Sequence, residues 1–217
     1  MKKTIVVVLG TVIVGTGIAG IGLAAAGSLA RQNAELADRI DAAAARSVAP
    51  GFKQADKFRA MDLPLLLEAL SSEDGAFEKT YLRIYGELPG TVQTWLPDVY
   101  PSAALRLNAA AVIGRWGPAA KDAIPQLIRL LHDDVADSNA ALSLGLMGLS
   151  AQEAIPALTI AVEEQRPFAA TALGRMGSAA KAARPILQLA AENGPVWLHR
   201  EVARALENIG EDLSARN

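Results

Sequence analysis

The residues best suited to catalysis or metal binding are two histidines, His132 and His199, and adjacent carboxylates at 133–134 and 163–164. A metal site needs several convergent ligands, and acid–base catalysis needs a carboxylate positioned against its substrate. Neither histidine belongs to a His-x-x-His or His-Glu pair, and both carboxylate pairs are expected in solvated links between helices. The sequence therefore predicts no catalytic residue, no metal site and no cofactor. We expect His132 to interact with a helix C-terminus.

A second candidate motif is the Gly-x-Gly-x-x-Gly string at residues 15–20. Dinucleotide binding requires such a string between a strand and a helix, inside a parallel sheet. No buried-strand pattern follows residue 30, so this function is not expected. Thr16, Gly20, Ala24 and Ser28 instead repeat at intervals of four, the small-residue spacing of packed membrane helices.

The N-terminal segment has the composition of a membrane helix. Lys2 and Lys3 precede an uncharged run over residues 4–30, and about 20 apolar residues cross a bilayer. A signal peptide cleaved at 24–26 is the alternative, and cleavage would leave a secreted structural spacer. The run is longer than a signal peptide needs, so we expect an uncleaved single-pass anchor. The short basic N-terminus is expected in the cytoplasm, with the rest of the chain outside it.

The composition excludes several partners and chemistries. The chain has 51% hydrophobic but only 5% aromatic residues, which favours closely packed helices rich in alanine and leucine. The formal net charge is -2, and both N-terminal lysines lie before residue 31. The remainder is therefore more acidic still, which argues against nucleic acid or an anionic membrane surface as its partner. The chain has no cysteine, which excludes disulfides and thiol nucleophiles.

An internal repeat organises the rest of the chain. Gly-x-x-Gly strings occur at 114–117, 145–148 and 174–177, and a proline follows each string after eight residues, at Pro125, Pro156 and Pro185. Glycine favours a helix end, and proline is tolerated in a first helical turn. Each copy therefore predicts a first helix, a small-residue link and a second helix. Such units bury their apolar faces only by stacking on their neighbours.

The same alignment extends the repeat in both directions. Residues 62–71 match a second helix, 76–86 a first helix, and 202–210 a last first helix without a partner. The copy around 89–101 is degenerate. We therefore expect three regions: an anchor helix at 1–30, a helical stalk and linker at 31–60, and a repeat domain at 61–217. Within the second region, residues 52–61 are expected as linker or a single helical turn.

Two strings carry a family resemblance. Ala-Leu-Gly-Arg-Met-Gly at 172–177 and Glu-Ala-Ile-Pro-Ala-Leu at 153–158 resemble HEAT-like repeats of the phycobilisome-lyase type. The resemblance covers about residues 61–210, with Arg184 departing from the isoleucine of the other copies. It implies an α-solenoid whose second helices line a protein-binding face. It does not imply bilin chemistry.

These observations predict an all-α chain: an α-solenoid of HEAT-like helical hairpins preceded by one transmembrane or signal helix. The expected function is a non-catalytic, membrane-anchored scaffold that binds another protein. A lyase-like or accessory protein that handles a chromophore or an enzyme partner is the alternative. The exposed face of the second helices is expected to bind the partner. Its candidate residues are Asp122, Gln126, Arg129 and Glu153.

Overall fold

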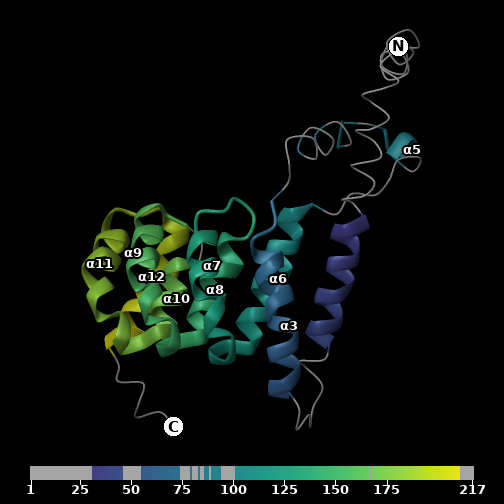
Figure 1. The fold of residues 1–217 in the computed structure, drawn as a ribbon. Coiled ribbons are helices and arrows are strands. Elements are labelled where there is room, and N and C mark those ends of the chain that lie inside the picture. Colours follow the sequence, from purple (N-terminus) through teal and green to yellow (C-terminus); the bar gives the residue numbers. More distant parts are fainter. Residues whose placement is uncertain are drawn as a thin grey trace. The chain divides into compact units, whose positions relative to one another are not determined.

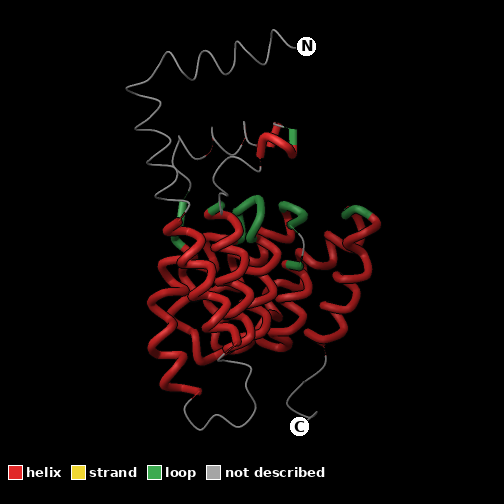
Figure 2. The backbone as a smooth tube through the Cα atoms, turned by 90° about the vertical axis from the view of Figure 1, so that its right-hand side faces the viewer, coloured by secondary structure: helices red, strands yellow, loops and turns green. Residues whose placement is uncertain are grey.

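The described part of the computed structural model consists of helices joined by turns and short loops (Figures 1 and 2). The described residues are 31–45, 55–73, 79, 83, 86–87, 89–93, 101–166 and 168–210. No strand occurs among them, so the prediction of an all-α chain is confirmed for this part. The expected anchor helix at residues 1–30 lies outside the described residues.

The chain divides into two units, Met1–Asp38 with Glu73–Ser102, and Arg39–Ser72 with Ala103–Asn217. In the described part of the first unit, residues 31–38 are helical and α5 (Gly90–Gln93) is a single short turn. The first helix expected at 76–86 is described only at positions 79, 83 and 86, all helical. The second unit carries the regular copies of the repeat.

Within residues 101–166 and 168–210, the chain forms three helix pairs, each a first helix, a 3-10 segment and a second helix. They are α6 (Ser102–Trp116), η1 (Gly117–Ala123) and α7 (Ile124–Leu130); α8 (Asp137–Met147), η2 (Gly148–Ala154) and α9 (Ile155–Glu163); and α10 (Ala169–Met176), η3 (Gly177–Ala183) and α11 (Arg184–Asn193). The last helix is α12 (Val196–Gly210). Each second helix carries proline in its first turn, as the sequence predicts.

The second glycine of each Gly-x-x-Gly string ends a first helix. Gly148 has φ +55° and ψ -127°, and Gly177 has φ +57° and ψ -133°. Both have positive φ, as expected, but their ψ lies far from the left-handed helical value of about +47°. A side chain at this combination is strongly disfavoured, so glycine is required for the turn into the 3-10 segment.

The first glycine of each string lets successive first helices approach closely. A Cβ atom built on Gly145 would lie 2.9 Å from the Cα of Ala172, and one on Gly174 would lie 2.8 Å from the Cα of Ala205. Ser143 Oγ also donates a hydrogen bond of 2.7 Å to the Ala110 carbonyl. Equivalent elements of successive helix pairs therefore pack against each other. Helix α8 contacts α10, α10 contacts α12, and α9 contacts α11 (Figure 1). Segment η1 likewise contacts η2.

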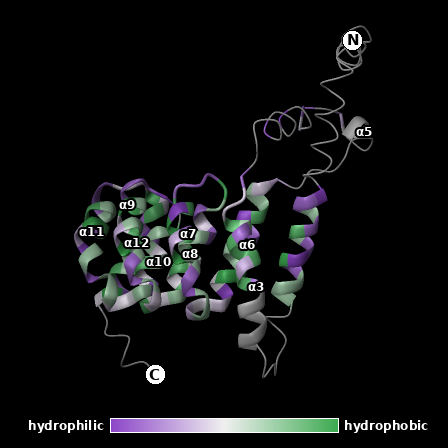
Figure 3. Cartoon of the chain, viewed as in Figure 1, coloured by the Kyte–Doolittle hydropathy of each residue, from purple (hydrophilic) through white to green (hydrophobic). Residues whose placement is uncertain are grey.

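The core of this unit consists of residues at recurring repeat positions. Trp116, Met147, Met176 and Ile209 share one position and are buried, as predicted. Alanines of the 3-10 segments are also buried: Ala120, Ala123, Ala151, Ala154, Ala180 and Ala183. Hydrophobic residues run along the helices, whereas most of the loops between them are hydrophilic (Figure 3).

Helix α3 (Ala55–Leu70) is longer than predicted. Residues 52–61 were expected as linker or a single turn, but the helix already begins at Ala55 and contains Pro64 in its interior. Alanine, lysine, arginine and methionine before Pro64 are good helix formers, so the helix extends ahead of the proline. Its second half packs on η1 and α7, which agrees with the prediction of a second helix at 62–71.

One described stretch, Asp137–Glu163, is long and apolar enough to cross a membrane by length and composition, with a mean hydropathy of 1.3. In the fold this stretch comprises α8, η2 and α9, and the turn at Gly148 interrupts it. The two α-helices have 11 and 9 residues. A continuous helix of about 20 residues is needed to span a bilayer.

Candidate functional site

The four residues predicted to bind a partner lie on two kinds of element. Gln126 and Arg129 lie on second helix α7, as predicted, whereas Asp122 lies in η1 and Glu153 in η2. The expectation that all four belong to second helices was therefore wrong for Asp122 and Glu153. The sequence places both just before a proline, where the chain is still in its 3-10 segment.

Asp122 and Glu153 nevertheless lie together, because η1 and η2 are neighbours. Both line an open cavity of about 530 Å³, with Lys121 and Pro125 among the other lining residues. Arg129 does not line this cavity. Small-molecule pockets are lined mainly by apolar and aromatic side chains. The described lining contains no aromatic residue and includes three charged ones, so it resembles an ordinary protein surface.

Gln126 is only partly exposed, and its Oε1 atom is buried without a hydrogen-bond partner among the described residues. A buried, unpaired amide oxygen costs free energy until it meets a donor. The same holds for the Nε1 donor of Trp116, which is buried at the end of α6.

The second helices carry a row of exposed residues at one repeat position. Arg129, Ile160 and Leu189 each lie four residues after the proline of their helix, and all three are exposed. Ile160 is 47% exposed and Leu189 52%. The side chain at this position thus changes from charged on α7 to apolar on α9 and α11. The proline alignment could have revealed this row, but only Arg129 was selected from it.

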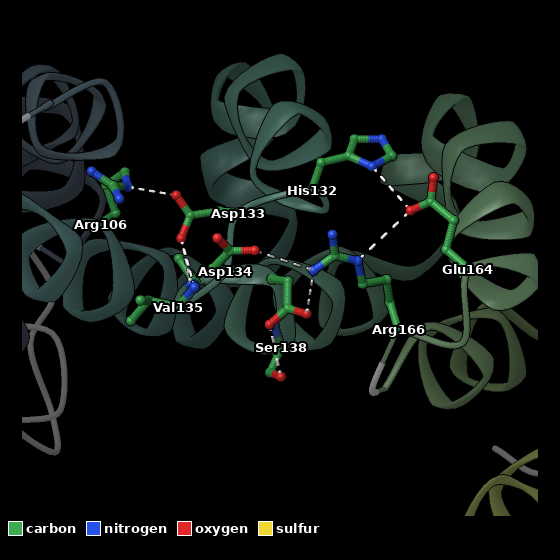
Figure 4. A network of polar contacts seen from close by, with 10 residues as sticks. Arg106, His132, Asp133, Asp134, Val135, Ser138, Glu164 and Arg166 are labelled. Carbon is green, nitrogen blue, oxygen red and sulfur yellow. Dashed lines mark hydrogen bonds and ion pairs between the residues drawn. The ribbon is translucent and has the colours of Figure 1, made fainter. Parts of the chain in front are cut away.

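The links that follow α7 and α9 carry a polar network that the sequence does not predict (Figure 4). Arg106 on α6 donates from Nε to Asp133 Oδ2 at 2.9 Å and from Nη1 to the Ser72 carbonyl at 2.7 Å. Asp133 Oδ1 accepts the backbone N–H groups of Val135 and Ala136 at 2.9 and 2.8 Å. Asp133 therefore joins the link after α7 to α6, while Arg106 also holds the end of α3.

The surroundings of Asp133 lower its pKa from the ordinary value of 3.8. Partial burial acts in the opposite direction and is the largest single influence, but it is outweighed by the combined effect of the hydrogen bonds from Ala136 and Val135 and the Arg106 guanidinium. The side chain of Asp133 is only 16% exposed. The expectation that the 133–134 pair is simply solvated was therefore wrong for Asp133, although it holds for Asp134, which is almost fully exposed.

A second part of the network connects the links after α7 and α9. Arg166 lies 3.6 Å from Asp137, 3.7 Å from Glu164 and 3.9 Å from Asp134. His132 follows the end of α7, and its Nδ1 lies 3.2 Å from Glu164 Oε2. These contacts are partly exposed, so each contributes little to stability, about 0–1 kcal/mol. Their arrangement ties consecutive links together and indicates a structural role.

Histidine and carboxylate side chains do not converge on a metal site in the described part of the chain. No group of three or more histidine, cysteine, aspartate or glutamate residues there is arranged to hold a metal ion. His199 bonds to the Gly194 carbonyl at 2.8 Å, far along the chain from His132. Comparison with protein-family models, curated proteins and solved structures finds no match for the chain. The row of exposed residues on the second helices, Arg129, Ile160 and Leu189, is the candidate functional surface.

Proposed function

We propose that this chain is a membrane-anchored, non-catalytic scaffold that binds another protein through the face of its second helices. The repeat domain is a HEAT-like α-solenoid in this proposal, and residues 4–30 are its single-pass anchor. The like-on-like packing of the helix pairs supports the solenoid, because stacked pairs bury their shared faces and leave one face of each second helix open.

The exposed row formed by Arg129, Ile160 and Leu189 carries the proposal. Large apolar side chains that recur on neighbouring helices mark interaction surfaces more often than scattered single ones do. Ile160 and Leu189 occupy equivalent positions on α9 and α11, which are in contact. Arg129 adds a charged side chain to the same row, and Asp122 and Glu153 add two more in the neighbouring segments η1 and η2.

Site-specific photocrosslinking in native membranes tests the scaffold. A benzoylphenylalanine residue at position 160 or 189 is expected to give discrete adducts with one or a few proteins. The same residue at position 149 is the control, because Leu149 is equally apolar and 69% exposed but lies in η2. Adducts that are the same from all three positions would contradict the proposal. So would a purified protein that carries a chromophore or metal in stoichiometric amount without any protein partner.

A further inference from the structure

A small cavity of about 240 Å³ opens between α9, α11 and the first turn of α12. Its floor includes Val162 and Leu198, both almost fully buried, and its wall includes Leu189 and Ile186. Cavities that hold drug-sized ligands measure about 300–1,000 Å³. This one is smaller and apolar, so it suits one or two apolar side chains of a binding partner better than a cofactor.

One lining residue of this cavity is negatively charged: Glu163, at the end of α9. Glu192 is not a lining residue, but it lies exposed in the last turn of α11, next to the lining residue Asn193 in the sequence. Neither forms an ion pair with another of the described residues. Both lie at helix C-termini, where the backbone carbonyl groups add a partial negative charge. The described lining contains no lysine or arginine. The uncompensated charge therefore favours a cationic group beside the apolar cavity.

Two exposed apolar residues adjoin the cavity in sequence. Val196 and Trp197 lie between Gly194 and Leu198, which both line it, and Trp197 is 55% exposed. Exposed tryptophan is enriched among residues that dominate binding energy at interfaces. Its ring face also attracts lysine and arginine side chains. Trp197 thus points to the same kind of partner as the two glutamates.

We infer that this cavity is a docking site for a segment of a partner protein that carries an apolar anchor side chain flanked by lysine or arginine. The inference rests on the proposed scaffold function and names the chemistry of the segment it binds. The anchor enters the cavity between α9 and α11, against Leu189. A flanking cation lies against Glu163, which lines the cavity, and the exposed Glu192 in the last turn of α11 adds to the attraction.

Fluorescence anisotropy with defined peptides tests the inference. The full-length chain is placed in phosphatidylcholine nanodiscs, whose neutral lipid does not attract basic peptides, and empty nanodiscs give the background. The probes are three labelled peptides: leucine and phenylalanine anchors with lysine and arginine flanks, the same anchors with glutamate flanks, and the basic flanks with serine in place of the anchors. The first peptide is expected to bind at least about tenfold more tightly than either of the others.

Variants of the cavity test the position of the site. Leu189→Ser is expected to weaken binding of the basic apolar peptide by about tenfold, and Glu163→Lys with Glu192→Lys by about fivefold. All three side chains are exposed, so we expect the variants to fold, and circular dichroism checks this. Leu149→Ser and Glu207→Lys are matched controls outside the cavity and are expected to change affinity less than twofold.

The outcomes separate this site from the scaffold itself. Equal binding of the basic and acidic peptides, or equal effects of cavity and control variants, would overturn the docking site. If crosslinks from positions 160 and 189 still capture a protein in membranes, the scaffold stands and only this site is lost. If those positions give no selective adducts while the peptide still binds the cavity, the scaffold proposal fails instead.

Discussion

Arg106 and Asp133 form an ion pair of 2.9 Å between two segments that are 27 residues apart in the sequence. Arg106 belongs to α6, and Asp133 lies in the link between α7 and α8. The same carboxylate accepts two backbone N–H groups at the start of α8, at Val135 and Ala136. One side chain thereby fixes both the entry into α8 and the position of that link against α6.

The lowered pKa of Asp133 predicts a pH dependence of stability. Because the folded-state pKa lies below the ordinary value of 3.8, the ionised carboxylate stabilises the fold fully above that value. The contribution is lost as the pH falls through the folded-state pKa. Asp133→Asn is therefore expected to lower the free energy of unfolding by about 1 kcal/mol at pH 7. The difference from wild type should shrink below about pH 4 in urea titrations.

Asp134→Asn is the control for this prediction. Asp134 is the neighbouring carboxylate, is almost fully exposed, and lies 3.9 Å from Arg166. Its substitution is expected to change the free energy of unfolding by less than about 0.5 kcal/mol at any pH. If Asp133→Asn lowered the free energy of unfolding by the same amount at acidic pH, the stabilisation by Asp133 would not come from the charge of its carboxylate.

The backbone of Gly148 predicts a large effect from a single methyl group. The residue has φ +55° and ψ -127°, and no atom lies within 4 Å of the position that a Cβ would occupy. Any loss in Gly148→Ala therefore comes from backbone strain and not from a clash. We expect about 1–3 kcal/mol of destabilisation in urea denaturation. Gly210→Ala has equally open space but no positive φ, and little effect is expected there.

Much of the described fold could be predicted from glycine and proline, because each imposes a local backbone requirement. Gly148 and Gly177 mark the ends of α8 and α10, and Pro125 lies in the first turn of α7. The start of α3 was missed, since helix formers without apolar periodicity precede Pro64. Glycine and proline therefore identify where several helices begin or end, but they do not reveal how far a helix such as α3 extends ahead of its proline.

The candidate site was less predictable, because it depends on which segments meet. Asp122 was selected as exposed, but its position beside Glu153 follows from the packing of η1 on η2. The Arg106–Asp133 pair joins α6 to the link between α7 and α8, 27 residues along the chain, so its spacing has no local signature. Leu189 lies at the position of Arg129, yet a leucine on a helix is normally assigned to the core. Its exposure becomes evident only when the second helices are packed.

The uncharged run at residues 4–30 predicts firm membrane attachment. The full-length protein is expected to remain in the membrane pellet after alkaline carbonate extraction, because a spanning helix is held by its whole apolar length. Intact mass spectrometry of the extracted protein should show these residues still present. A variant without residues 1–30 should move to the supernatant. A native mass that lacks the first 24–26 residues would establish cleavage and leave a secreted spacer.

The close approach of Gly145 to Ala172 predicts that the stability of the fold depends on tight packing between the first helices α8 and α10. A Cβ on Gly145 would lie 2.9 Å from the Cα of Ala172, which is backbone and cannot move aside without shifting α10. Alanine improves helix propensity by up to about 1 kcal/mol, but overpacking costs about 1–3 kcal/mol. We therefore expect Gly145→Ala to lower the free energy of unfolding by about 1–2 kcal/mol, measured by urea denaturation.

The equivalent position in α12 supplies a matched control. It is occupied by Glu207, which is exposed, and no described helix packs on it as α10 packs on Gly145. Glu207→Ala is expected to change the free energy of unfolding by less than about 0.5 kcal/mol. If Gly145→Ala were as harmless, first helices could separate at no cost, and close helix approach would not explain the glycine. If only Gly145→Ala lowered the free energy of unfolding, glycine would be required at this position where another first helix packs on it.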